Sequence, residues 1–337
     1  MIGKSEATAK GKGTSEKLET GPTKFVGADG IQIAYRSFRN ESGTPLVFLQ
    51  HFSGTMDDWD PAVVNGIAKD RPVVVFDNTG VGKSSGKTPD NVPQMAADAA
   101  HFISALGLKN VDLLGFSLGG LVAQQLAFDH PELVRRIVLA GTAPQGGEEH
   151  LLKVLSEAYS QKAASDPRLY LFFTQSEASQ AAGRAFLERA NVRQVDRDPP
   201  SGKEVTDPQA KAIITWCAIK DPEQLILKAI SQPVLVVNGS NDIMLPTGNS
   251  YVMFKHLRAA KLILYPDSGH GALFQYAEDF VYQTTRFLTE ITMSPEEGIA
   301  LPTRKLTKKA TSPAARDRRS GSKQCAGQSK RSWRCFQ

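Results

Sequence analysis

Ser117 is the first residue of this chain whose surroundings suggest chemistry. It lies at the centre of a G-x-S-x-G pattern, in GFSLGG, between an apolar run typical of a buried strand and a helical run. A serine on such a sharp turn exposes its hydroxyl, and the flanking glycines keep side chains out of the turn. The N-terminus of the next helix offers N–H groups that suit a developing oxyanion. The pattern indicates a nucleophile, although a glycine-rich turn capped by serine would look the same.

Two later residues could activate this serine. A serine hydroxyl needs a base to take its proton, and the base needs an acid to orient it. Asp242 follows the apolar run 232–240 in GSNDIMLP, and His270 follows the apolar run 261–266 in DSGHG. The order Ser, Asp, His suits a strand–turn–helix nucleophile. Asp242 could also be a simple turn residue, and Asp267, three residues before His270, is a rival acid.

The elements that must position these residues alternate between strand and helix. Strands are predicted at Ile31–Phe38, Pro45–Gln50, Pro72–Phe76, Asn110–Phe116, Arg136–Ala140, Val234–Asn238 and Lys261–Tyr265, and helices at Val92–Leu106, Leu118–Asp129, Ser250–Leu257 and Phe280–Glu290. Continuous Val/Ile/Leu runs are typical of parallel strands buried on both faces. The pattern predicts an α/β fold with an open, mostly parallel sheet flanked by helices. The three candidate residues would meet at the carboxyl ends of its strands.

A long insertion separates the strand ending at Ala140 from the one starting at Val234. Helical stretches at Glu148–Ser160, Ser176–Ala190 and Asp207–Ile219, with a break at 196–202, predict a helical cap over the catalytic edge. Such a cap would form a pocket and exclude water. The candidate lining residues are Leu171, Phe172, Phe173, Trp216 and Ile219, although aromatics at helical spacing often only hold a cap together.

From about Phe25 to Glu290 the chain resembles the α/β-hydrolase family. The resemblance rests on the GFSLGG segment, the Asp242 and His270 loops, PLVFLQHFSG, which is similar to the family's oxyanion loop, and RPVVVFDNTGVGKS, where Thr79 stands in place of the usual arginine. It implies Ser117 as nucleophile, His270 as base and Asp242 as its acid. It also implies that the N–H groups of Leu118 and Ser53 bind the oxyanion. Phe52, in place of the usual glycine, would narrow the pocket mouth.

The resemblance implies a serine hydrolase that cleaves a carboxylic ester or lactone of a small molecule through an acyl-enzyme. It also admits a cofactor-free perhydrolase, a carbon–carbon bond hydrolase, or a small-molecule receptor without turnover. No cofactor and no metal are expected. The GKS at 82–84 lacks the first glycine of a phosphate loop, because Asp77 occupies that position.

Composition and charge suggest how the chain is divided. Residues 1–22 are expected to be a disordered leader, 23–144 and 229–292 the hydrolase core, 145–228 the cap, and 293–337 a basic disordered tail. The net charge of +5 comes from the ends, since the segment from 301 onward carries +10 and 25–300 carries −7. The tail could meet an anionic surface, but no specific nucleic-acid partner is predicted.

Three cysteines, at 217, 325 and 335, suit a reducing compartment, and a cytoplasmic location is expected. We find no run of apolar residues long enough to span a membrane. The number of subunits is left open by the sequence.

Overall fold

The computed structural model describes residues 16–38, 43–160 and 166–290. Within them, eight strands form one sheet in the order β1-β2-β4-β3-β5-β6-β7-β8. Their bounds are β1 (Lys24–Ala28), β2 (Ile31–Phe38), β3 (Leu46–Leu49), β4 (Val73–Phe76), β5 (Val111–Phe116), β6 (Val134–Ala140), β7 (Val234–Gly239) and β8 (Ala260–Tyr265). The β1–β2 and β2–β4 pairs are antiparallel, and the strands from β4 to β8 pair in parallel.

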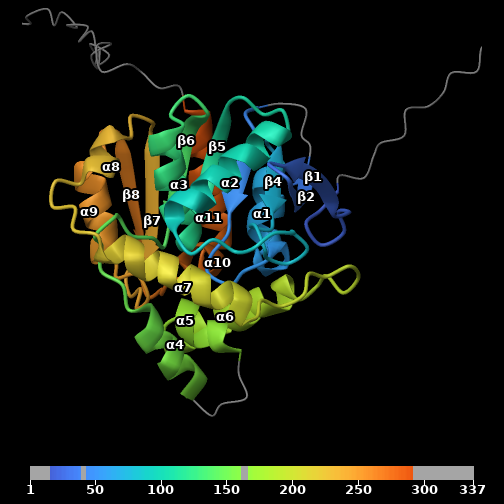
Figure 1. Ribbon diagram of the computed structural model, residues 1–337. Coiled ribbons are helices and arrows are strands. Elements are labelled where there is room, and N and C mark those ends of the chain that lie inside the picture. The colour runs from blue at the N-terminus through green and yellow to red at the C-terminus, as the bar shows by residue number, and fades with distance from the viewer. Residues whose placement is uncertain (1–15, 39–42, 161–165, 291–337) are drawn as a thin grey trace, which may run out of the picture. The chain divides into compact units, whose positions relative to one another are not determined.

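Helices cover both faces of the sheet. Outside the long insertion they are α1 (Pro61–Ala68), α2 (Val92–Ala105), α3 (Leu118–Asp129), α9 (Gly248–His256), α10 (Ala272–Gln275) and α11 (Ala277–Thr289), with a short 3-10 helix, η1 (Met56–Asp58), before α1. Figure 1 shows α2 and α3 in front of the sheet and α11 behind it. The predicted α/β fold with its mostly parallel sheet is confirmed.

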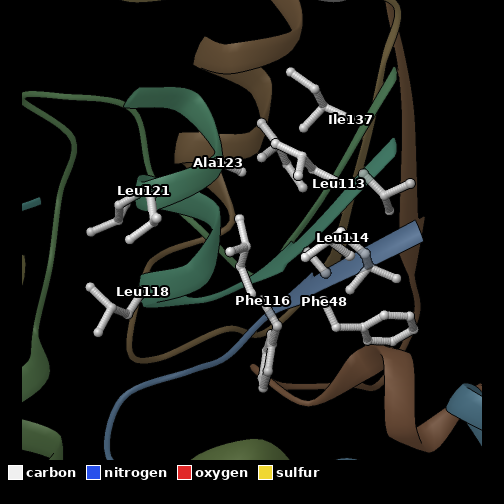
Figure 2. Packing of buried hydrophobic residues seen from close by; sticks show 14 of the residues in the cluster. Phe48, Leu113, Leu114, Phe116, Leu118, Leu121, Ala123 and Ile137 are labelled. Atoms are coloured by element: carbon white, nitrogen blue, oxygen red, sulfur yellow. The ribbon is translucent and has the colours of Figure 1, made fainter. Parts of the chain in front are cut away.

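Strand burial explains why the middle of the sheet could be recognised. Every residue of β3, β4, β5 and β7 is buried, as expected for parallel strands covered on two faces. Figure 2 shows α3 beside β5, with buried side chains such as Leu113, Phe116 and Ala123 packed together. This packing fixes the junction between β5 and α3, where Ser117 lies.

The long insertion between β6 and β7 is helical. It contains α4 (Leu151–Ser160), α5 (Pro167–Phe172), α6 (Glu177–Ala190), α7 (Lys203–Ala218) and α8 (Leu225–Ala229). We refer to residues 145–228 as the cap segment. Figure 1 shows α4 to α7 gathered at one end of the strands, with α7 nearest the sheet.

The folded part of the chain begins before the expected boundary at residue 23. Leu18 is buried, and its N–H donates to Asn65 Oδ1 of α1 at 2.9 Å. Residues 16–22 therefore pack on the core, which differs from the expected leader. The rest of that leader, at 1–15, and the expected basic tail at 293–337 lie outside the described residues. No helix among the described residues is both long and apolar enough to cross a membrane.

Gly119 gives a direct test of this packing. A Cβ atom added there would lie 2.0 Å from the carbonyl oxygen of Leu49 in β3, and backbone atoms cannot rotate away. We expect Gly119→Ala to lower the free energy of unfolding by more than about 4 kcal/mol or to prevent folding. Chemical denaturation would measure the change. Gly248→Ala is the matched control, because a Cβ there meets nothing within 4 Å, and a similar loss in both variants would contradict the explanation.

Candidate active site

Ser117 occupies a strained turn between β5 and α3. Its backbone has φ 56° and ψ −119°, a region that non-glycine residues rarely adopt. The turn is held from two sides, since Ser117 N–H donates to Ala140 O at 2.9 Å and Thr142 Oγ1 donates to Ser117 O at 2.8 Å. Gly115 allows the turn, because a Cβ there would lie 2.3 Å from the carbonyl oxygen of Gly119. Such an observed strain in a concave site is typical of functional residues.

Asp242 and His270 form a buried hydrogen-bonded pair. His270 Nδ1 lies 2.8 Å from Asp242 Oδ2, and both side chains are almost fully buried. The other carboxylate oxygen, Oδ1, accepts from the N–H groups of Met244 at 2.9 Å and Leu245 at 3.1 Å. These contacts fix the carboxylate, so His270 holds its Nδ1 proton toward Asp242 and leaves Nε2 without a proton.

Asp267, the alternative candidate for the orienting acid, binds residues other than His270. Asp267 accepts hydrogen bonds from Thr174 and Ser176, both at 2.6 Å, and is exposed. The Ser176 hydroxyl, followed by that of Thr174, lowers the pKa of its carboxyl group. Asp267 thus ties the cap segment to the loop before His270, whereas Asp242 accepts the hydrogen bond from the imidazole.

Ser117 and His270 line the same pocket. Its volume is about 490 Å³, within the usual range of small-molecule sites. His270 Nε2 is buried and has no hydrogen-bond partner among the described residues, including Ser117. Catalytic hydrogen bonds are often loose until a substrate binds. The free nitrogen is therefore placed to accept a proton from a group in this pocket.

In the loop after β3, three of the four N–H groups from His51 to Gly54 are engaged. His51 N–H donates to Gln50 Oε1 at 2.8 Å, and Gly54 N–H donates to His51 O at 3.2 Å. Ser53 N–H donates to Gln209 Oε1 at 2.6 Å. Phe52 N–H has no acceptor among the described residues, and Phe52 lines the pocket. The expected oxyanion role of Ser53 N–H does not fit this arrangement, because Gln209 already binds that hydrogen.

The pocket is lined by apolar residues, which we call its apolar wall, and by polar residues, which we call its polar wall. Of the residues expected to line it, Phe52, Leu171 and Phe172 do so. Phe173 and Trp216 are not in its lining and are buried in the hydrophobic core, and Ile219 is exposed. The lining that sequence reasoning missed comprises Leu155, Tyr159 and Met244, and the polar residues His51, Thr55, Asp58, Asp166, Arg168, Arg197, Asp198 and Ser201.

Three carboxylates after β3 fasten the cap segment to the core. Asp57 accepts from the backbone N–H of Asp198 at 2.7 Å, and Asp58 accepts from Arg168 at 3.1 Å. Asp60 binds Arg189, with Oδ2 at 2.7 Å from Nη2. All three partners belong to the cap segment, so these contacts fix the polar wall of the pocket relative to Ser117.

The first of these contacts includes a buried cation. Arg36 of β2 is fully buried and binds Asp57 at 2.6 Å and Asp198 at 3.3 Å. Burial and the nearby charge of Asp57 raise the pKa of Asp198 to about 6. Burial opposes ionisation of Asp57 too, but the hydrogen bond and charge of Arg36, together with hydrogen bonds from Asp198, outweigh it and lower the pKa of the Asp57 carboxyl group. Opposite charges therefore pair where the cap segment meets the core, and this makes the burial tolerable.

The described residues contain no group of three or more His, Cys, Asp or Glu side chains that could hold a metal ion. Cys217 is partly buried and not in a disulfide, and burial raises the pKa of its thiol to about 12. Among the described residues, these observations give no second set of reactive groups besides Ser117, Asp242 and His270.

Comparison with known proteins agrees with the α/β fold described above. The family model described as the alpha/beta hydrolase fold matches residues 44–276. The solved alpha/beta hydrolase fold protein from Chitinophaga pinensis is 43% identical, with a TM-score of 0.78 over 82% of this chain and 100% of that one.

Two curated enzymes are more distant relatives. Pimeloyl-[acyl-carrier protein] methyl ester esterase from Nitrosomonas europaea is 28% identical over 71% of this chain and 94% of its own length. Poly(3-hydroxyalkanoate) depolymerase from Ectopseudomonas oleovorans is 26% identical over 73% of this chain and 85% of its own. Because the family model covers more than half of the sequence, we conclude that the chain is an enzyme of the alpha/beta hydrolase family.

Proposed function

We propose that this enzyme is a serine hydrolase that cleaves a carboxylic ester of a small molecule through an acyl-enzyme. The observation that carries the proposal is the buried His270–Asp242 pair in the pocket that Ser117 lines. His270 Nε2 has no hydrogen-bond partner among the described residues, and His270 lines the same pocket. A nucleophile, a base and an orienting acid in one pocket are the parts that acyl transfer needs.

The proposed reaction begins at the ester carbonyl. Ser117 Oγ attacks the carbonyl carbon while His270 Nε2 takes the hydroxyl proton, and the ester oxygen then leaves as an alcohol with that proton. Water attacks the acyl-enzyme with the same base and releases the carboxylic acid and the free serine. Asp242 keeps His270 in the required tautomer and stabilises its cation.

Two backbone N–H groups are the proposed oxyanion donors. Leu118 is the first residue of α3, and the first N–H groups of a helix have no acceptor within the helix. Phe52 N–H, which is free in the loop after β3, is the second proposed donor in place of Ser53 N–H. Together they would bind the charge that forms on the carbonyl oxygen in the transition state.

The pocket supports an acyl group of small or medium size. Leu155, Leu171, Phe172 and Met244 form an apolar wall in a volume of about 490 Å³. One relative is a methyl ester esterase by its name, which also favours an ester as the bond that is cleaved. The polar wall, with Arg168 and Arg197, suits a polar leaving group.

The proposal is tested with p-nitrophenyl esters from acetate to decanoate. We expect turnover that depends on Ser117, with an optimum at short to medium chains because the pocket volume is about 490 Å³. The same enzyme is assayed with lactones, with dienoate carbon–carbon substrates and with peroxide plus a short acid. Ser117-dependent turnover of one of these alone would replace the ester proposal, and binding without turnover would favour a receptor.

A further inference from the structure

We propose that Gln209, in helix α7 of the cap segment, is a positioning residue that sets the oxyanion loop. The inference rests on the proposed function, because it concerns the loop that carries Phe52 N–H. Gln209 is fully buried, and its Oε1 accepts the hydrogen of Ser53 N–H at 2.6 Å. It therefore joins the cap segment to the loop beside Ser117, over 156 positions of sequence.

Ser53 needs such a contact because of its backbone conformation. Its φ is 60°, in the left-handed region that is strained for a non-glycine residue. Gly54 N–H donates to His51 O, so Phe52 and Ser53 are the two central residues of a turn. A positive φ at the second central position is typical of a type II turn, which favours glycine there. With serine in place of glycine, outside contacts are needed to hold the turn.

Side chains hold the peptide between Phe52 and Ser53 at both of its ends. Gln209 binds its N–H, and His51 Nδ1 lies 2.8 Å from its carbonyl oxygen. A carbonyl oxygen only accepts, so His51 must carry its proton on Nδ1. Burial lowers the pKa of His51 to about 4, which keeps the ring neutral in that tautomer at ordinary pH. Because the peptide between Phe52 and Ser53 is held at both ends, the direction of the neighbouring Phe52 N–H is also fixed.

The amide of Gln209 is itself oriented by its surroundings. Ser53 N–H can only donate, so the amide atom facing it is the oxygen and Nε2 points the other way. Nε2 and the hydroxyl groups of Thr79 and Thr88 are buried without partners among the described residues. These three residues line a cavity of about 10 Å³, the space that one water molecule needs.

We expect the loss of Gln209 to affect catalysis and not substrate binding. Gln209 is not in the lining of the pocket, so its loss would leave the substrate's contacts in place. It would release the turn that presents Phe52 N–H, an interaction that matters most in the transition state. Loss of transition-state contacts lowers kcat with little change in KM.

The test compares two cap-segment glutamines changed to methionine. Gln209→Met keeps the shape of the side chain and removes the acceptor. We expect kcat to fall about 10- to 100-fold with KM within about threefold, since a complete loss of one oxyanion donor costs about 10²- to 10³-fold. Inhibition by an alkylboronic acid, which forms a tetrahedral adduct with the serine, should weaken by the same factor.

Gln180→Met is the matched control, because Gln180 donates only to the carbonyl groups of Leu169 and Thr174 within the cap segment. It should keep kcat within about twofold. Gln209→Glu retains an acceptor oxygen and should recover part of the loss, since a buried carboxyl group tends to stay protonated. Gln209→Asn, one methylene too short to reach Ser53, should behave like Gln209→Met and serves if that variant does not fold.

The outcomes separate this inference from the proposed function. If Ser117→Ala abolishes turnover while Gln209→Met and Gln209→Asn match Gln180→Met, the inference is wrong and the proposed function stands. A rise in KM at unchanged kcat and unchanged boronate affinity would also overturn it. If the Ser117→Ala variant retains turnover, both the proposed function and this inference are wrong.

Discussion

Replacing Ser117 with alanine is expected to lower kcat on the best p-nitrophenyl ester by about 10⁶-fold, with the fold and stability retained. Removing the nucleophile leaves His270 and Asp242 with nothing to activate, and residues that act as one unit lose nearly all their effect together. Alanine keeps the Cβ atom of serine, so it should fit the turn with φ 56° as serine does. Steady-state kinetics at enzyme concentrations high enough to detect residual turnover would measure the loss.

A second pocket serine provides the control for this result. Ser201 lines the same pocket, and its Oγ is buried without a partner among the described residues. It lies in the segment between α6 and α7, and no base among the described residues is hydrogen-bonded to its hydroxyl. Ser201→Ala should therefore change kcat by less than about tenfold. Residual turnover near the wild-type rate in Ser117→Ala would show that another group attacks the substrate.

The parts of the fold that could be predicted from the sequence are those whose signal is local. Strand β2 and helix α3 begin and end at the predicted residues, because β2 follows a clear turn and α3 starts at the glycine-flanked serine. Strand β1 was not predicted, since Phe25 points to solvent and the strand lies at the edge of the sheet. Helix α7 starts four residues before the prediction because it continues through Pro208.

The parts of the site that could not be predicted depend on contacts between distant segments. Nothing near Asp57, Asp58 and Asp60 indicates that their partners lie more than 100 positions away in the cap segment. The same holds for the oxyanion loop, where the hydrogen bond of Ser53 to Gln209 decides which N–H is free. Trp216 was a reasonable pocket candidate by its position on a helix, but burial in the core makes it part of the packing.

Replacing Asp242 with asparagine is expected to lower kcat by about 10⁴-fold while leaving the shape of the site intact. The reason is the pair of N–H groups from Met244 and Leu245, which bind Oδ1 of the carboxylate. In the variant, the N–H groups of Met244 and Leu245 still bind an oxygen, which is now the oxygen of the amide. The amide nitrogen therefore faces His270 Nδ1. That nitrogen can only donate, and His270 must then carry its proton on Nε2. A base in this tautomer cannot take the serine proton.

The rival acid supplies the comparison that makes this prediction sharp. Asp267→Asn changes the same atoms three residues from His270, but Asp267 binds Thr174 and Ser176. We expect its kcat to stay within about threefold of the wild type, with the main effect on the thermal midpoint. Equal losses in the two variants would mean that charge near His270, and not the tautomer set by Asp242, controls the reaction. A large loss in Asp242→Asn alone would show that one hydrogen bond of 2.8 Å fixes the base.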